Sequence, residues 1–356
     1  MRKYLKFAAL CLLAALVLFW FGRNLNWNEV SEAIRRADVR LIAVACLFVC
    51  LTYFLRALRW RALLAPLAPE TSLRELFAAT TVGFGAVFLI GRAGEVVRPA
   101  FLPLREPRVR PSASFVTIAV ERIYDMSAIV VLFAANLLVF RAPGGDAAAY
   151  ARVRQAGLLL LIGAVAGIAA LVWFRRRADV VVGWLEGLLT RAPRVVNRVG
   201  RIATGLLAQL ARSLGVLTDA RELLVTVGLT ALLWGSIALA NFLVMRAFGL
   251  GLGLSAAVFV MGWSLVGSLV PTPGGAAGTF HAATAAGLIF LGIARPEAAA
   301  ISIILHLVVF APALFFGLYY FLRSDVSLAR LRHLMSTEDD DGVAAKPAGV
   351  ATSEVA

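Results

Sequence analysis

The sequence predicts an all-α integral membrane protein with about six full transmembrane helices, two re-entrant or broken helical hairpins and an inverted-topology repeat. Of its 356 residues, 61% are hydrophobic and 16% are charged, and the mean hydropathy is +0.85. Several uncharged stretches approach the roughly 20 residues that a helix needs to cross a bilayer. Glycines, prolines and charges interrupt two apolar stretches in corresponding positions of the two halves, which is the pattern of an inverted repeat.

Basic residues stand mostly at the ends of the apolar runs, although the formal net charge is +14. This distribution orients membrane helices, so it argues against nucleic acid as a partner. Cys11, Cys46 and Cys50 lie inside apolar segments, and no Cys-x-x-Cys or Cys/His ligand spacing occurs. We therefore expect packing roles for the cysteines, no metal site and no cofactor.

The charges that flank each predicted span assign its direction. Basic residues before the first span place the N-terminus in the cytoplasm, and arginines after the last span place the C-terminus there too. The spans are expected at residues 7–22, 41–64, 112–140, 156–174, 223–248 and 297–321.

Three arginines, Arg56, Arg59 and Arg61, recur at helical spacing near the end of the second span. Long arginine side chains can reach the membrane interface while their stems stay in apolar surroundings. We expect these three to anchor the helix on the cytoplasmic side, so that it runs from outside to inside.

The chain is expected to form one polytopic membrane domain over residues 1–335. Its repeat halves cover residues 41–140 and 223–322, and a basic cytoplasmic linker over residues 175–222 joins them. Arginines interleaved with apolar residues in the linker predict amphipathic helices, which either contact anionic headgroups or present a solvated face. The polar residues 336–356 are expected to form a disordered tail.

The first hairpin is predicted where the apolar run 73–90 enters the sequence Gly91-Arg92-Ala93-Gly94-Glu95-Val96-Val97-Arg98-Pro99. Basic residues flank it on both sides, so it should enter and leave by the cytoplasmic face. Gly91, Gly94 and Pro99 supply the break in the helix, which is tolerated at membrane depth only in protein or beside a polar cavity. The alternative is one ordinary span followed by a cytoplasmic loop.

A second charged run, Glu121-Arg122-Ile123-Tyr124-Asp125, interrupts the span 112–140. Each ionised side chain at the bilayer centre costs roughly 2.5–3.5 kcal/mol on insertion scales, so such residues pair, face water or carry function. Glu121 and Asp125 share a helix face because they are four residues apart. A purely structural ion pair between Glu121 and Arg122 is one interpretation. The other is a neutral buried set of Arg92, Arg98, Arg122, Glu95, Glu121 and Asp125.

The second half repeats this plan in the opposite direction. A span is followed by the apolar run 254–270, the run 279–293 and a last span, with a break at Pro271-Thr272-Pro273-Gly274-Gly275. Paired interrupted segments point to a substrate site at the interface between the repeats, where the broken backbone offers free N–H groups.

The runs from Gly91 to Arg98, from Glu121 to Asp125 and from Pro271 to Gly275, in this order and spacing, resemble the lysylphosphatidylglycerol synthetase transmembrane family, also called flippase-like. The resemblance covers about residues 5–325. It implies a multi-pass protein of the prokaryotic cytoplasmic membrane, linked to movement of aminoacylated phospholipids, isoprenoid-linked intermediates or glycolipids. Larger members carry a soluble aminoacyltransferase domain after the membrane part, and only a short tail stands there in this chain, so lipid aminoacylation is not expected. His281 stands where a carboxylate or an arginine is common.

We expect the protein to translocate a phospholipid or a lipid-linked intermediate through a polar groove. Arginine suits a phosphate because it stays charged and donates two parallel hydrogen bonds, so Arg92, Arg98 and Arg122 are the expected phosphate contacts. The carboxylates would hold these arginines or meet a cationic headgroup. The expected headgroup-binding residues are Arg92, Glu95, Arg98, Glu121, Arg122, Asp125, Pro271, Pro273, Gly274, Gly275, His281 and His306.

Other functions and partners stay open on sequence. A membrane transferase acting on a lipid-linked substrate would use Glu121 or Asp125 as a base, although the chain shows no nucleophile, nucleotide motif or metal motif. A non-catalytic partner of envelope or glycolipid enzymes is the third class, and a homo-oligomer is also open. His281 and His306 are expected either to pack in apolar surroundings or to couple transport to protons.

Overall fold

The computed structural model describes residues 15–23, 25–140, 147–177, 220–270 and 272–324, together with a few isolated positions. Within these ranges the regular elements are α-helices and one short 3-10 helix, with no strand, which confirms the all-α class. The elements are α2 (Trp27–Arg36), α3 (Val39–Leu64), α4 (Leu73–Ile90), η1 (Gly91–Val96), α5 (Val97–Arg105), α6 (Pro111–Val139), α7 (Ala147–Arg176), α10 (Ala220–Ala247), α11 (Leu254–Gly267), α12 (Pro273–Phe290) and α13 (Arg295–Leu322).

Several predicted features lie outside the described residues. They are the beginning of the first predicted span, Pro271, most of the linker 175–222 and the tail 336–356. The backbone of Arg92 is described, but its side chain is not. The expectations for these features stay predictions.

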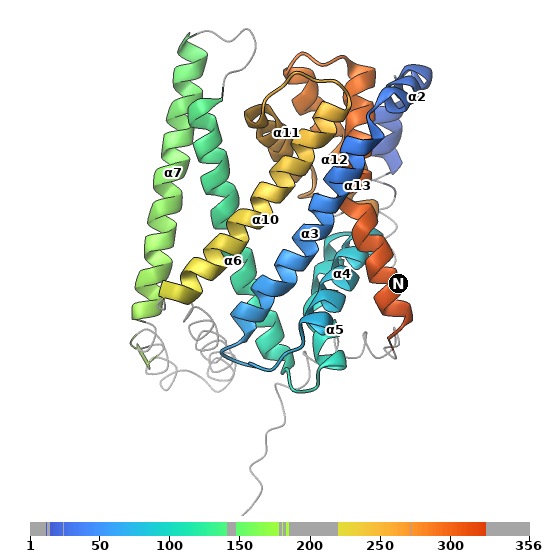
Figure 1. Cartoon of the computed structure of the whole chain (residues 1–356). Coiled ribbons are helices and arrows are strands. Elements are labelled where there is room, and N and C mark those ends of the chain that lie inside the picture. Colours follow the sequence, from blue (N-terminus) through green and yellow to red (C-terminus); the bar gives the residue numbers. More distant parts are fainter. Residues whose placement is uncertain are drawn as a thin grey trace, which may run out of the picture.

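Four long helices, α3, α6, α10 and α13, run through the height of the bundle (Figure 1). The shortest of them, α3, has 26 residues, which at 1.5 Å per residue is about 39 Å, enough to cross the hydrocarbon core. Their outer faces carry large apolar side chains such as Leu224, 73% exposed, and Phe315, 74% exposed. Such faces suit contact with lipid. The 30-residue helix α7 packs beside α6.

The first hairpin consists of α4, η1 and α5. Length and composition alone would let α4 cross the membrane, but Gly91, with φ 68°, ends it, and η1 and α5 return along it. Arg105 Nε lies 2.8 Å from Glu75 Oε2, so the two ends of the hairpin meet. A Cβ added to Gly94 would overlap the backbone of α4, so glycine is needed for this close approach. The chain therefore enters and leaves the hairpin at the same end, as predicted.

The second hairpin consists of α11 and α12. Across it, Ser264 Oγ and Thr284 Oγ1 are 2.8 Å apart. Gly274, Gly275 and Ala276 have φ values of 74°, 62° and 59°, which interrupt the helix directly after its first residue. The break predicted at the double glycine is confirmed. It extends to Ala276, where the left-handed conformation costs a non-glycine residue about 1–2 kcal/mol.

The two halves have the same plan and opposite directions. The first half runs α3, the α4–α5 hairpin and α6, and the second runs α10, the α11–α12 hairpin and α13. In Figure 1 the first hairpin occupies one end of the bundle and the second occupies the other. The N–H of Asp38, before α3, donates to the carbonyl of Ala247, at the end of α10, so these central helices are antiparallel. The predicted inverted arrangement is present.

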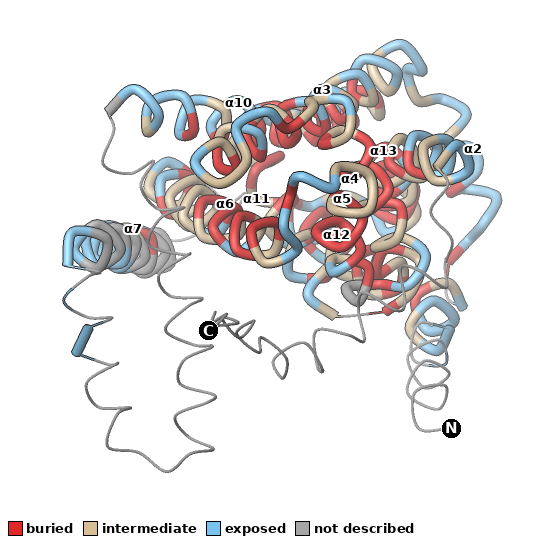
Figure 2. Tube along the Cα trace, turned by 90° about the horizontal axis from the view of Figure 1, so that it is seen from below, coloured by how far each residue is buried: buried red, intermediate tan, exposed pale blue. Residues whose placement is uncertain are grey.

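Buried residues concentrate where the hairpins meet the long helices, whereas α7 presents exposed positions (Figure 2). The largest side chains with no more than 2% exposure include Trp60, Phe101 and, unexpectedly, Arg59. A fully buried arginine at the core of a membrane protein indicates a buried charged centre.

Candidate functional site

Two carboxylates on α6 form the centre of a buried charged cluster. Glu121 and Asp125 are 0% and 1% exposed. Arg98 of α5 donates from Nη1 to Glu121 Oε1 over 2.6 Å. A short, charge-assisted hydrogen bond of this kind offsets part of the cost of burying both ions. The predicted contact between the first hairpin and the charges of α6 is therefore observed.

Helix α3 supplies two more arginines to the cluster. Arg59 lies 2.8 Å from Asp125 and 3.2 Å from Glu121, measured between nitrogen and oxygen, and Arg56 Nη1 lies 3.3 Å from Asp125 Oδ2. Arg56 and Arg59 are buried, at 7% and 0% exposure. The prediction that they anchor α3 at the cytoplasmic interface is wrong, because the carboxylates of α6 draw them into the interior.

The direction in which each side chain points around the axis of α3 distinguishes these two arginines from Arg61. Arg56 and Arg59 share a face of α3 with Thr52 and Leu63, which are also buried, whereas Arg61 is exposed. At about 100° per residue, Arg61 points about 200° away from Arg59.

The cluster carries more positive than negative charge. Among the described side chains it contains four arginines and two carboxylates, namely Arg56, Arg59, Arg98, Arg122, Glu121 and Asp125. Glu95 of η1 lines the adjacent cavity, and counting it still leaves one positive charge in excess. The predicted neutral set is therefore wrong for the described part of the chain, because two arginines of α3 join it.

Aromatic residues fix the position of the charged groups. The guanidinium of Arg98 stacks over the ring of Trp60 at 4.3 Å, which adds a cation–π contact to its hydrogen bond. Trp234 of α10 donates from Nε1 to Asp125 Oδ1 over 3.2 Å. The central helices α3 and α10 thus each contribute an aromatic residue that restrains the cluster.

The arginines keep hydrogen-bonding capacity that the described groups do not use. Nε and Nη2 of Arg98 and Nε of Arg122 are buried and have no hydrogen-bond partner in the described part of the chain. Unused buried donors are costly, so water or a ligand oxygen would stabilise them. Of these donors, Arg122 Nε belongs to a residue that lines the adjacent cavity, and Glu121 Oε2 is a buried acceptor that likewise has no hydrogen-bond partner among the described residues.

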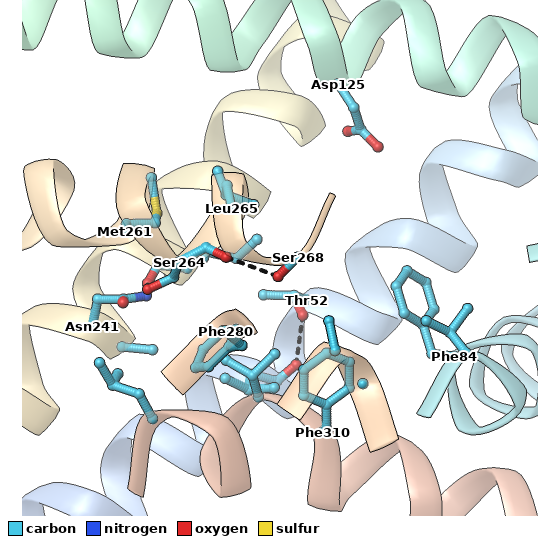
Figure 3. Close-up of a pocket in the computed structure, with 18 of the residues that line it drawn as sticks. Thr52, Phe84, Asp125, Asn241, Met261, Ser264, Leu265, Ser268, Phe280 and Phe310 are labelled. Carbon is cyan, nitrogen blue, oxygen red and sulfur yellow. Dashed lines mark hydrogen bonds between the residues drawn. The ribbon is translucent and has the colours of Figure 1, made fainter. Parts of the chain in front are cut away.

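A cavity of ≈ 270 Å³ lies beside the cluster, where the tips of the two hairpins meet. Gly91 and Glu95 line it from the first tip, and Thr272 and Gly275 line it from the second. Figure 3 shows Asp125 on one side of this cavity, with Phe280 and Phe310, among other side chains, on the other. Asp125 thus lies across the cavity from Phe280 and Phe310. The cavity lies at the interface between the repeats, and the substrate site predicted there stays a prediction.

Only part of the cluster faces the cavity. Arg56, Arg122 and Asp125 line it, whereas Arg98 and its partner Glu121 are not among the lining residues and lie behind. The side chain of Arg122 is 39% exposed, and its Nη2 lies 3.8 Å from Glu121 and 3.9 Å from Asp125. These distances exceed those of the other arginines. Arg122 is therefore the most available guanidinium, and Arg98 does not face the space in which it was expected to contact a phosphate.

The two histidines lie behind the second hairpin tip. The ring centroids of His281 and His306 are 4.8 Å apart, and His306 Nε2 lies 3.3 Å from the carbonyl oxygen of Gly275. Neither lines the cavity, and both rings pack against Phe280. Of the remaining predicted residues, Pro273 is the first residue of α12 and Gly274 the second. Among the described residues, no group of three or more acidic, histidine or cysteine side chains could hold a metal ion.

Comparison with known proteins supports a membrane family. The sequence matches the family described as "Lysylphosphatidylglycerol synthase TM region" over residues 7–317. It is 27% identical to Glycosyltransferase AglD of Haloferax volcanii over 347 residues, which cover 89% of this chain and 54% of that protein. It is also 27% identical to a UPF0104 membrane protein of Pyrococcus horikoshii over 175 residues, which cover 48% of this chain and 47% of that protein. The chain thus spans about half the length of these curated relatives.

Proposed function

The chain belongs to the lysylphosphatidylglycerol synthase transmembrane-region family, and from this premise we propose that it moves a phospholipid or a lipid-linked intermediate across the cytoplasmic membrane. The observation that carries the proposal is the excess of arginines over carboxylates in the cluster beside a cavity between two hairpin tips, an excess that includes the partly exposed Arg122. Excess positive charge at membrane depth is costly unless an anion joins it. The phosphate of a lipid headgroup supplies such an anion.

Arg122 and Arg56 are the residues that we propose for contact with the phosphate. Both line the cavity, and a guanidinium can donate two parallel hydrogen bonds to a phosphate. The long distances from Arg122 to the carboxylates leave it free to turn toward a ligand. Arg59 and Arg98 are positioning residues in this proposal, because they hold the carboxylates from behind.

In this proposal each hairpin closes the cavity toward the end of the bundle that the hairpin occupies. A headgroup that arrives from either side must pass one tip, while its chains stay in apolar surroundings. Gly91 in the first tip and Gly275 in the second have positive φ values, which glycine adopts without strain. We propose that the two tips open alternately around these glycines, so that the cavity communicates with one side at a time.

Transport of fluorescent phosphatidylglycerol and of a fluorescent polyprenyl phosphate in reconstituted vesicles tests the proposal. Arg122→Gln and Arg56→Gln should each lower the transport rate about tenfold or more, because a hydrogen bond to a charged group contributes roughly 1.5–3 kcal/mol. Arg61→Gln is the matched control, because Arg61 is exposed on the same helix as Arg56. Wild-type protein that moves neither probe, or a double variant that transports normally, would refute the proposal.

A membrane transferase is the second candidate, because one relative is named a glycosyltransferase. The carboxylates are not well placed as bases for it. Glu121 does not line the cavity and accepts a hydrogen bond from Arg98, and Asp125 is engaged by Arg59 and Trp234. Transfer of a labelled sugar from a nucleotide sugar to polyprenyl phosphate by the purified protein, lost in Asp125→Asn, would favour this candidate over transport.

A further inference from the structure

A second, apolar groove lies between α6 and α10. Its volume is ≈ 500 Å³, against ≈ 270 Å³ for the polar cavity beside the charged cluster. Side chains of Val131, Leu132 and Val227 are typical of its lining, which comes from these two helices alone within the described residues. A groove with such walls binds hydrocarbon and excludes charged groups.

Two side chains connect this groove to the charged cluster. Trp234 lines both the groove and the polar cavity, and its indole N–H donates to Asp125 Oδ1. Thr230 lines the groove and accepts a hydrogen bond from Arg59 Nη1 over 3.0 Å. The polar cavity and the groove therefore share Trp234 as a lining residue, so a molecule with its charged end in the polar cavity has an apolar space for an attached chain close by.

We propose that the groove between α6 and α10 holds a hydrocarbon chain of the lipid whose phosphate occupies the polar cavity. This inference rests on the proposed transport function. It assigns the part of the site that binds the hydrocarbon portion of the transported lipid. A headgroup can enter the protein interior only if its covalently attached chains find apolar surroundings beside it.

The groove is expected to align the chain and to add little affinity. A lipid chain that leaves the bilayer for the groove exchanges one hydrocarbon environment for another, so no large hydrophobic gain results. What it gains is orientation, because a fixed chain limits the positions that the headgroup can take beside Arg122 and Arg56.

The lining of the groove suits a hydrocarbon chain, because most of it is apolar. Small residues on both walls, Ala128 and Ala135 on α6 and Ala231 and Gly235 on α10, provide this space. In membrane proteins such residues usually let helices touch. Here they leave a space that a flexible chain can fill.

Photolabelling tests the inference in vesicles of phosphatidylcholine that contain phosphatidylglycerol with a photoreactive acyl chain. Labelling of the groove segments 127–135 and 231–235 should exceed labelling of Leu224, which is 73% exposed on α10 but outside the groove. Gly235→Leu should lower groove labelling about tenfold, because the added side chain overpacks a filled site. Gly228→Leu is the matched control, since Gly228 also has open space around it and does not line the groove.

Each outcome decides one of the two proposals. Equal labelling of the groove and Leu224, or unchanged labelling in Gly235→Leu, overturns the groove, and if transport still depends on Arg122 the transport proposal stands. Groove labelling that Gly235→Leu abolishes, in a protein that moves no lipid, supports the groove as a lipid site and overturns transport. If Gly235→Leu does not fold, the comparison within the wild-type protein still decides.

Discussion

At the scale of single residues, charge partners decide where an arginine lies in this protein. Arg56 and Arg61 belong to the same helix, yet Arg56 is buried and Arg61 is exposed. Asp125, the partner of Arg56, stands 69 residues further along the chain. The carboxylates could be predicted as buried from their place in an apolar run, but the contact between α3 and α6 that selects their partners is tertiary and has no local signal. The site was therefore predicted only in part.

The charge excess makes the cluster more sensitive to the loss of a carboxylate than of an arginine. Glu121→Gln leaves Arg98 buried without its charged partner and should destabilise the protein by about 3–5 kcal/mol. Arg98→Gln should cost less, because Glu121 keeps Arg59 at 3.2 Å. Thermal denaturation in detergent, followed by intrinsic fluorescence, measures both effects.

The double variant provides the control for this comparison. Glu121→Gln combined with Arg98→Gln removes both partners of the shortest ion pair among the described side chains of the cluster. This double variant should recover part of the stability lost in Glu121→Gln. An equal or greater loss in Arg98→Gln than in Glu121→Gln would contradict an excess of positive charge in the cluster.

At the scale of elements, the two hairpins were predictable because glycines, prolines and charged residues interrupt their apolar runs. Charges and glycines at membrane depth fit a continuous lipid-facing helix poorly, so they mark a turn inside the protein. The left-handed conformation at Ala276 and the 3-10 form of Gly91–Val96 were not predictable. The 3-10 segment packs against α4 and α5 of its own hairpin and against α12, and such tertiary contacts have no local signal.

Close packing within the first hairpin predicts a large effect of a small substitution. Gly94→Ala places a methyl group against the backbone of α4, so the hairpin must open, at a cost of about 1–3 kcal/mol. We expect a lower melting temperature in detergent and slower lipid transport. Gly163→Ala on α7 is the control, because nothing lies within 4 Å of an added Cβ there. Equal stability of the two variants would show that η1 does not hold the hairpin closed.

At the scale of the whole molecule, the inverted repeat brings two hairpin tips to one cavity. One tip contributes Glu95 and the other Thr272, which are far apart in the sequence and meet only because the halves point in opposite directions. The paired interruptions predicted such a meeting point. The apolar groove beside it could not be predicted, because small residues such as Ala128 and Gly235 would equally let α6 and α10 touch.

The same architecture places the two hairpins at opposite ends of the bundle, and the charges that flank them predict which end is cytoplasmic. Basic residues border both ends of the first hairpin, so Ala68 and Arg108 should be cytoplasmic, together with both termini of the chain. The second hairpin starts at the opposite end of the bundle, so Gly251 should lie outside.

Single cysteines at these three positions, in a protein without its three native cysteines, can be labelled in intact cells with a membrane-impermeant maleimide. We expect labelling from outside at position 251 only. Labelling of positions 68 and 108 from opposite sides would contradict the hairpin and the inverted repeat together, whereas the mirror-image pattern would reverse only the orientation in the membrane.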